Sequence, residues 1–157
     1  EKGEGQGKET RPGYWNNVHG IAVDPTTREV FVNDRDNGRV QVFDENGNYL
    51  REWNFWKGRR GAPQDIHSFI VTSDQKLWAA DQGTHKILGY DLEGHYLYSW
   101  GSWGEYPGGM WGVHGMSTDN EGNFYTASVN NGRIQKFRPR AGANPEFMVG
   151  KPWPGVW

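Results

Sequence analysis

Val18-His19-Gly20-Ile21-Ala22-Val23-Asp24, followed by Asp34-Arg35-Asp36-Asn37-Gly38-Arg39-Val40-Gln41-Val42-Phe43, is the stretch that decides the fold, because it recurs twice in altered form. The second copy covers residues 66–71 and 81–90, and the third covers 113–118 and 128–137. The leading histidines of the three copies are 48 and 47 residues apart. A fixed period of roughly 20 to 50 residues is typical of a repeat architecture.

Each copy divides into four short runs of strand-forming residues, separated by turn residues. The runs are 19–23, 29–33, 39–43 and 49–53, then 68–72, 76–80, 86–90 and 96–100, then 115–118, 123–127, 133–137 and 147–150. Short strands at about ten-residue spacing favour an antiparallel all-β fold, and no stretch shows helical periodicity. Four strands in one repeat of this length make one propeller blade. The sequence therefore predicts an all-β protein with three blades, over about residues 17–53, 65–101 and 112–150, in a single domain spanning residues 1–157.

Composition excludes several classes of site. The chain has no cysteine, which rules out disulfides and thiolate metal sites. Its net charge of −2 makes nucleic acid an unlikely partner, and the absence of a long apolar run predicts no membrane span. No signal peptide is visible, and the first residues do not resemble a natural start, so we expect a mature or trimmed product. The expected location is periplasmic or extracellular.

The repeat resembles a known family. His-Gly-Ile-Ala-Val-Asp at 19–24, the run Val-Phe-Val-Asn-Asp-Arg-Asp-Asn-Gly-Arg-Val-Gln-Val-Phe-Asp at 30–44 and the closing Trp53 are similar to the NHL repeat. That family forms six-bladed propellers, so the resemblance implies half of a six-bladed ring. A half-ring exposes two apolar blade faces. We therefore expect a second copy, another protein chain or the missing blades of a longer protein to complete the ring.

The strongest candidate site is formed by His19, His67 and His114, which start the first strand of each blade. In a propeller this strand lines the central channel, so the three imidazoles should converge near one mouth. Neutral imidazole is a common zinc ligand, which makes a metal site one interpretation. The other interpretation is that each histidine belongs to the repeat pattern and is hydrogen-bonded to its surroundings.

The first repeat is also similar to a blade of the peptidyl-α-hydroxyglycine α-amidating lyases. In that family three histidines from alternate blades bind zinc, and an arginine in a D-R-x-N-G-R-I/V-Q segment reaches the active site. His19 and His114 match two of those histidines, and Arg35 matches the arginine. The resemblance implies a zinc Lewis acid that promotes carbon–nitrogen cleavage, with Arg35 as a catalytic residue on the substrate carboxylate. A surface arginine paired with Asp34 or Asp36 is the alternative interpretation of Arg35.

His67 lies on the blade where the lyase pattern has no ligand. If two chains close the ring by a two-fold axis, His19, His114 and the partner's His67 come from alternate blades and form one triad. Two functions remain open at this point. One is a zinc-dependent amidating lyase-like enzyme, and the other is a non-catalytic propeller that binds a partner, such as a peptide, or builds an assembly. The absence of half the ring favours the scaffold.

Two further groups of residues have a less specific interpretation. His85 and His95 fall in hairpin turns and are expected to be solvated. The basic cluster Lys57, Arg59 and Arg60 could hold an acidic or nucleic-acid ligand, as some NHL propellers bind RNA. With a net charge of −2, a solvated loop between blades is the favoured interpretation.

Overall fold

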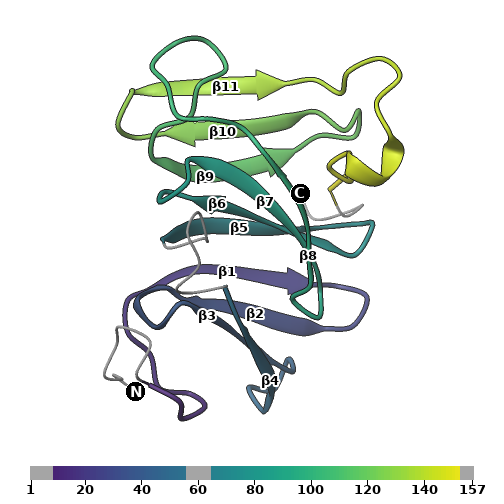
Figure 1. Ribbon diagram of the computed structural model, residues 1–157. Helices are drawn as coiled ribbons and strands as arrows, with labels where there is room; N and C mark the ends of the chain where they lie inside the picture. Colours follow the sequence, from purple (N-terminus) through teal and green to yellow (C-terminus); the bar gives the residue numbers. More distant parts are fainter. Residues whose placement is uncertain (1–8, 56–64, 153–157) are drawn as a thin grey trace.

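Three antiparallel β-sheets make up the computed structural model, which describes residues 9–55 and 65–152 (Figure 1). Blade 1 contains β1 (Val18–Asp24), β2 (Glu29–Asp34), β3 (Arg39–Phe43) and β4 (Tyr49–Asn54). Blade 2 contains β5 (Ile66–Thr72), β6 (Lys76–Asp81), β7 (Lys86–Asp91) and β8 (Tyr96–Trp100). Blade 3 contains β9 (Val113–Thr118), β10 (Phe124–Ser128) and β11 (Arg133–Phe137). The prediction of an all-β fold built from three propeller blades is confirmed.

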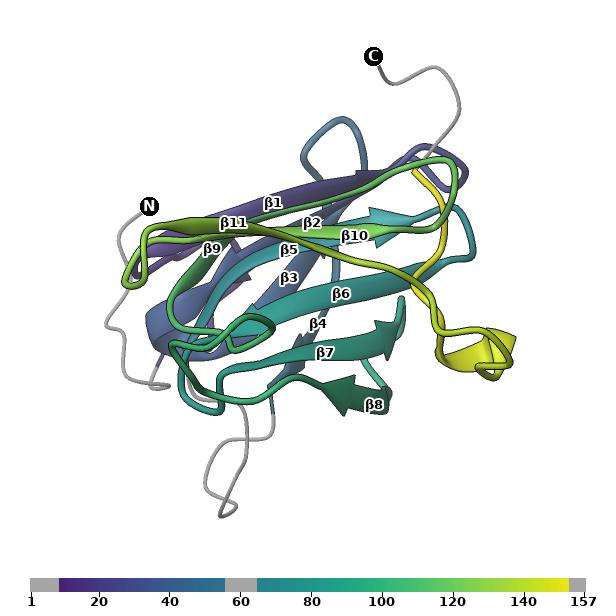
Figure 2. The same ribbon diagram turned by 90° about the horizontal axis from the view of Figure 1, so that it is seen from above.

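The blades stack one on another in chain order, as Figures 1 and 2 show. Within blades 1 and 2 the strands follow one another across the sheet, and their first strands, β1 and β5, lie side by side at the inner edge. The helical content of the described residues is limited to two three-residue 3-10 turns, η1 (Arg35–Asn37) and η2 (Pro145–Phe147). None of the helices in residues 9–55 and 65–152 could cross a bilayer.

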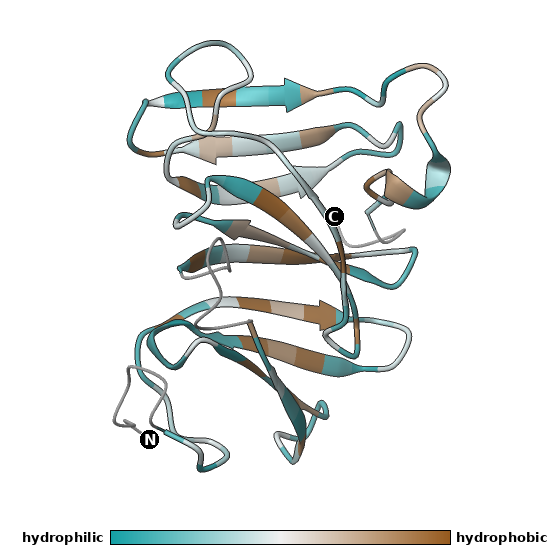
Figure 3. Ribbon diagram, viewed as in Figure 1, coloured by the Kyte–Doolittle hydropathy of each residue, from teal (hydrophilic) through white to brown (hydrophobic). Residues whose placement is uncertain are grey.

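Apolar side chains fill the spaces between neighbouring blades. Phe31 and Val40 of blade 1 are fully buried in one cluster with Phe69 and Leu77 of blade 2. A second cluster joins blades 2 and 3, and its largest buried member is Trp78. Both clusters arise from the period-two alternation of the strands, which sends successive side chains to opposite faces of a blade. Figure 3 shows hydrophobic residues, coloured brown, along the strands of the blades.

The prediction of a fourth strand at 147–150 in blade 3 is wrong. This segment forms η2 and then an irregular stretch, because Pro145 begins the turn and the Asn144 side chain accepts a hydrogen bond from the Glu146 backbone N–H. The backbone then docks on blade 2, where Ser73 N donates to Lys151 O at 3.0 Å. Lys76 Nζ also donates to Glu146 O at 3.0 Å. As a result, β11 is the outer strand of blade 3.

Two sequence predictions fall on parts of the chain that the structure does not describe. The basic cluster Lys57, Arg59 and Arg60 lies outside the described residues, and so does most of the apolar, proline-rich tail 152–157, which the sequence predicts to pack on a neighbouring blade or a partner chain.

Candidate functional site

His19, His67 and His114 meet at one end of the stacked blades. Each is the second residue of the inner strand of its blade. The ring centroids are 5.0 Å apart for His19 and His67, 4.2 Å for His67 and His114, and 5.8 Å for His19 and His114. Because equivalent positions in adjacent inner strands lie side by side, the repeat itself brings the three imidazoles together.

The backbone fixes the residue two positions before each histidine in the same way. Arg35 N donates to Asn17 O at 3.3 Å, Gln82 N donates to Asp65 O at 2.9 Å, and Val129 N donates to Gly112 O at 2.8 Å. These bonds tie the start of each inner strand to the turn after the second strand. They also place the side chains of residues 35, 82 and 129 at the same end of the molecule as the histidines.

Each imidazole has an oxygen within hydrogen-bonding distance of one ring nitrogen. His19 Nδ1 lies 2.8 Å from His67 O, and His114 Nδ1 lies 3.1 Å from Gly112 O. His67 Nε2 lies 3.0 Å from Asp65 Oδ2. A carbonyl or carboxylate oxygen only accepts, so each of these contacts is a hydrogen bond in the tautomer that carries its proton on the named nitrogen. Such oxygen partners orient histidines in metal sites, where the second ring nitrogen is the ligand.

The contact between His67 and His114 depends on which ring nitrogens carry protons. His67 Nδ1 lies 2.8 Å from His114 Nε2. If neutral His67 carries its proton on Nε2 for Asp65, two nitrogen lone pairs face each other across this contact. If the proton is on Nδ1, the Nε2 lone pair faces the Asp65 carboxylate instead. Both contacts are satisfied together when His114 carries a proton on Nε2 that it donates to His67 Nδ1, when His67 carries a second proton, or when a metal ion lies between the rings.

The environment of His67 opposes that second proton. Burial lowers the pKa of His67, and the neighbouring His114 and Arg35 lower this pKa further, while Asp65 acts in the opposite direction and raises it. The net pKa is below the ordinary value for histidine. At neutral pH a second proton on His67 is therefore unfavourable, although a proton on Nδ1 would point at His114 Nε2.

Arg35 joins the histidine cluster through Asp65. Its Nε lies 3.2 Å from Asp65 Oδ1 and 3.3 Å from Asp36 Oδ1, and its Nη1 lies 3.4 Å from His67 Nε2. Arg35 thus pairs with Asp36, as one sequence interpretation expected, but it also bridges blade 1 to blade 2. Asp34 is occupied elsewhere, since it is buried and accepts from Arg39 Nε at 2.8 Å.

Sequence reasoning missed Asp65. Its carboxylate connects Arg35 to His67, whereas the equivalent positions in the other blades are Asn17 and Gly112. The repeat alignment contains a signal for it, since Asp65 is the only carboxylate at this position of the three copies, as Arg35 is the only arginine at its own, where Gln82 and Val129 stand in the other copies.

The two remaining histidines behave differently from each other. His95 is exposed and pairs with Asp91 at 2.8 Å. His85 is only partly exposed, and its buried Nδ1 has no hydrogen-bond partner among the described residues. The prediction of solvation therefore fits His95 better than His85.

The three imidazoles are suitable metal ligands by their chemistry, but the spacing of their nitrogen atoms does not match a metal site. Within the described residues, no group of three or more His, Cys, Asp or Glu side chains is arranged to hold a metal ion. One departure from metal spacing is the contact of 2.8 Å between His67 Nδ1 and His114 Nε2. Two nitrogens that bind a tetrahedral zinc at about 2.0–2.1 Å lie about 3.3 Å apart. The two rings would have to separate by about half an ångström, which a rotation about the side-chain torsions can supply.

Comparison with known proteins identifies one repeat family in the chain. The family model described as the NHL repeat matches residues 16–43, which span β1 to β3 of blade 1. No curated protein matches the sequence.

Solved structures with the same architecture are β-propeller proteins. A streptogramin B lyase structure aligns with a TM-score of 0.56 at 16% identity, over 78% of this chain and 40% of that one. Virginiamycin B lyase from Staphylococcus aureus gives a TM-score of 0.53 at 13% identity, over 78% and 41% of the two chains. Kuenenia stuttgartiensis hydrazine synthase gives 0.55 at 15% identity, over 83% and 38%. The chain spans about 40% of the length of these proteins, and the likeness establishes the propeller fold.

Proposed function

We propose that this chain is an NHL-repeat propeller segment that works as a binding or assembly scaffold, completing a six-bladed ring with a second copy, another chain or further blades of a longer protein. The observation that carries this proposal is a difference in exposure between equivalent positions of the repeat. The same positions are buried where a neighbouring blade is present and exposed where it is absent.

The outer face of blade 1 illustrates the difference. Ile21 and Val23 on β1 are 66% and 52% exposed. Their equivalents on β5, Phe69 and Val71, are 3% and 9% exposed, because they pack against blade 1. Repeat units that cannot bury their apolar face alone are stabilised by stacking. Since a neighbouring blade covers the equivalent face of blade 2, we infer that another blade also covers this face of blade 1.

The outer face of blade 3 has the complementary difference. Ile134 on β11 is 79% exposed, whereas its equivalents Val40 and Ile87 are fully buried against the following blade. The two outer faces are thus the two halves of an ordinary blade–blade contact. A ring of six blades built from two such segments would join the face of Ile134 to the face of Ile21.

Analytical ultracentrifugation at micromolar concentration tests this proposal. We expect the chain to associate, and Ile134→Asp to shift it to monomer with its circular dichroism spectrum retained. Leu97→Asp on β8 is the matched control, since Leu97 is 43% exposed but lies on an outer strand away from both faces, and association should persist. A wild-type chain that remains a well-folded monomer at tens of micromolar would contradict ring completion by a second copy.

The histidine cluster favours a second candidate function, a zinc-dependent enzyme similar to the amidating lyases. In that case His19, His67 and His114 would hold zinc, which supplies a Lewis acid for carbon–nitrogen cleavage when bound. Arg35, held between Asp36 and Asp65, would bind a substrate carboxylate beside the cluster. The convergence of the three imidazoles and the 2.8 Å approach of His67 Nδ1 to His114 Nε2 support this alternative.

Metal analysis separates the two functions. If the enzyme proposal is right, isothermal titration with Zn²⁺ gives about one ion per complete histidine set, and His114→Asn removes the binding. His95→Asn, which alters an exposed histidine outside the cluster, should bind as the wild type does. Less than about 0.1 zinc per chain after purification with added zinc would eliminate the enzyme and leave the scaffold.

A further inference from the structure

We propose that blade 3 receives its fourth strand from outside residues 9–152, and that the outer edge of β11 with the pocket beside it accepts an extended segment of the pattern aromatic-Leu-x-Glu-Trp. This inference concerns the strand edge of one blade. It holds whether or not the outer blade faces associate, so the two proposals can fail separately.

The fourth strands of the other two blades share a sequence. β4 begins Tyr49-Leu50-Arg51-Glu52-Trp53, and β8 reads Tyr96-Leu97-Tyr98-Ser99-Trp100. Both therefore follow the pattern Tyr-Leu-x-x-Trp, and both pair antiparallel with the third strand of their blade. No such pattern follows β11, where residues 147–151 are Phe-Met-Val-Gly-Lys.

The first aromatic residue of each fourth strand makes the same contact. Tyr49 lies opposite Phe43, with ring centroids 5.8 Å apart and an interplanar angle of 75°. Tyr96 lies opposite Tyr90, at 5.9 Å and 74°. Cross-strand aromatic pairs of this kind stabilise and set the register of antiparallel strands. The equivalent third-strand residue in blade 3 is Phe137, so an incoming strand should place an aromatic ring against it.

The outer edge of β11 is open for such a strand. Among the described residues, β11 pairs only with β10, and the backbone of Arg133–Phe137 makes no other backbone hydrogen bond. An open edge presents a row of unpaired N–H and C=O groups to which a peptide can add by β-augmentation.

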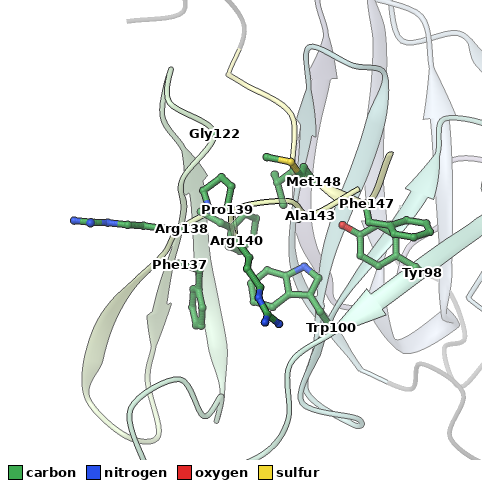
Figure 4. Close-up of a pocket in the computed structure, with 12 residues that line it drawn as sticks. Tyr98, Trp100, Gly122, Phe137, Arg138, Pro139, Arg140, Ala143, Phe147 and Met148 are labelled. Carbon is green, nitrogen blue, oxygen red and sulfur yellow. The ribbon is translucent and has the colours of Figure 1, made fainter. Parts of the chain in front are cut away.

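A pocket lies where the aromatic ring of the incoming strand would be. It has a volume of about 270 Å³ and opens between β8 of blade 2 and the end of β11 (Figure 4). Phe137, Trp100 and Tyr98 form part of its wall. In blades 1 and 2 the third-strand aromatic is covered by the tyrosine of the fourth strand. Phe137 instead contacts Trp100, with centroids 5.0 Å apart, and its other surroundings form the pocket.

The chain's own downstream segment lines this pocket with Phe147, Met148 and Val149 but does not pair with β11. Phe147 contacts Tyr98 at 5.0 Å and remains 55% exposed. The segment continues to the Ser73–Lys151 hydrogen bond on blade 2 and does not turn back along β11. An occupant of the β11 edge must therefore come from elsewhere.

Charge favours a strand of the β4 type over the β8 type. In blade 1, Arg39 Nη1 of the third strand pairs with Glu52 Oε2 of the fourth at 2.8 Å. The residue equivalent to Arg39 in blade 3 is Arg133, while blade 2 has Lys86 and no glutamate opposite it. Arg133 donates to the backbone carbonyls of Glu105 and Tyr106, and no carboxylate of the described residues forms an ion pair with it. A glutamate directly before the tryptophan of the incoming strand would complete the same pair as in blade 1.

A peptide copied from β4 tests the proposal with the 157-residue chain as it exists. A fluorescently labelled peptide of residues 47–55, Gly-Asn-Tyr-Leu-Arg-Glu-Trp-Asn-Phe, should bind saturably in an anisotropy titration, and the amides of 133–137 should become protected from hydrogen exchange. Replacing its tyrosine by alanine should weaken binding roughly tenfold, because the ring against Phe137 is lost. Replacing its glutamate by glutamine should weaken binding roughly fivefold.

Protein variants make the outcome specific. Arg133→Ala should weaken the wild-type peptide roughly fivefold and leave no further loss for the glutamine peptide, as in a double-mutant cycle. Arg28→Ala is the matched control, since this exposed arginine pairs with Glu45 within blade 1 and does not line the pocket, and binding should be unchanged. A scrambled peptide that binds equally, protection that appears outside 133–137, or protection of 133–137 in the free chain by self-association would each overturn the proposal.

Discussion

Blades 1 and 2 meet differently from blades 2 and 3, although the same repeat positions form both contacts. Between blades 1 and 2, Trp53 is 8% exposed and packs on Tyr90 and Phe55, with centroids 5.3 and 5.1 Å away. Between blades 2 and 3, the equivalent Trp100 is only half-buried and borders the 270 Å³ pocket. The tryptophan at the outer end of the first contact is therefore shielded from solvent, whereas the equivalent tryptophan of the second contact is partly exposed to solvent.

The turn after the third strand causes this difference. In blade 2 the tight turn after β7 lies over Trp53, and a Cβ at Gly94 would be 2.4 Å from the Trp53 ring. Arg51 reinforces the cover by donating to Leu92 O at 3.2 Å. In blade 3 the corresponding segment is longer and contains Pro139 and Pro145, so it passes beside Trp100 without covering it. The comparison teaches that one hairpin turn decides whether a blade contact is closed.

The largest expected effect comes from the two tryptophans. Trp53→Ala should cost about 3–5 kcal/mol of unfolding free energy, because it removes a buried ring from a sealed contact. Trp100→Ala should cost about 1–3 kcal/mol, since its ring is already partly solvated. Urea unfolding followed by circular dichroism measures both. Equal losses would mean that the two contacts are sealed to the same degree.

The two equivalent glycines of the last turns provide the next test. Gly94 and Gly47 have nearly the same φ, 87° and 85°, but a Cβ at Gly47 would meet no atom within 4 Å. Gly47→Ala should therefore cost only about 1 kcal/mol, for the left-handed backbone. Gly94→Ala adds a steric conflict with Trp53 and should cost about 2–4 kcal/mol in total. Thermal unfolding of the pair would contradict the role of the turn if the two midpoints fell together.

A smaller effect is expected where Asp65 links blade 1 to blade 2. Asp65→Asn removes the ion pair with Arg35 and should cost less than about 1 kcal/mol at pH 7. Its effect should grow on acidification. Because burial holds the pKa of His67 below its ordinary value, the unfolded chain binds the proton more readily, and stability falls as pH drops through about 6.5 toward the folded pKa.

Asp65 raises the pKa of His67, so its removal lowers this pKa further and makes the loss of stability at acid pH steeper. Unfolding midpoints measured from pH 7.5 to pH 5 test the slope. Asp36→Asn is the control, because Asp36 touches Arg35 without contacting His67. A variant slope at or below that of the wild type would show that Asp65 does not govern the proton on His67.

The smallest expected effect concerns His85. Its φ is 55°, and the equivalent residues in the other blades are Gly38 and Gly132, at 63° and 57°. A left-handed backbone is unfavourable for a residue with a Cβ. His85→Gly should therefore stabilise the chain by about 0.5–1 kcal/mol, and Gly132→His should destabilise it by a similar amount. Denaturant midpoints would refute this if both substitutions moved stability in the same direction.

Most of the fold could be predicted from the sequence because its information is local and repeated. Strand alternation and turn residues recur three times, and eleven expected strands lie where the structure has them. The twelfth failed because Phe147 and its neighbours have strand-like residues but lack the Tyr-Leu-x-x-Trp pattern, and their competing contacts with blade 2 are not visible in the sequence. The convergence of the three histidines followed from repeat position. Whether the three histidines bind metal stays a prediction, since it depends on displacements of their ring nitrogens by fractions of an ångström, which the sequence does not encode.

The described segments that lead into blades 1 and 3 are each held by the blade that follows. Gln41 accepts from Gly13 N at 2.8 Å, and Gln135 accepts from Gly108 N at 2.7 Å, each within a Pro-Gly sequence just before the blade. Arg39 and Arg133 add bonds to the carbonyls of Tyr14 and Tyr106. The unit that can be duplicated or exchanged without loss therefore starts at the linker and ends after the outer strand. A gene duplication cut at that boundary transfers the blade together with the hydrogen bonds that hold its linker.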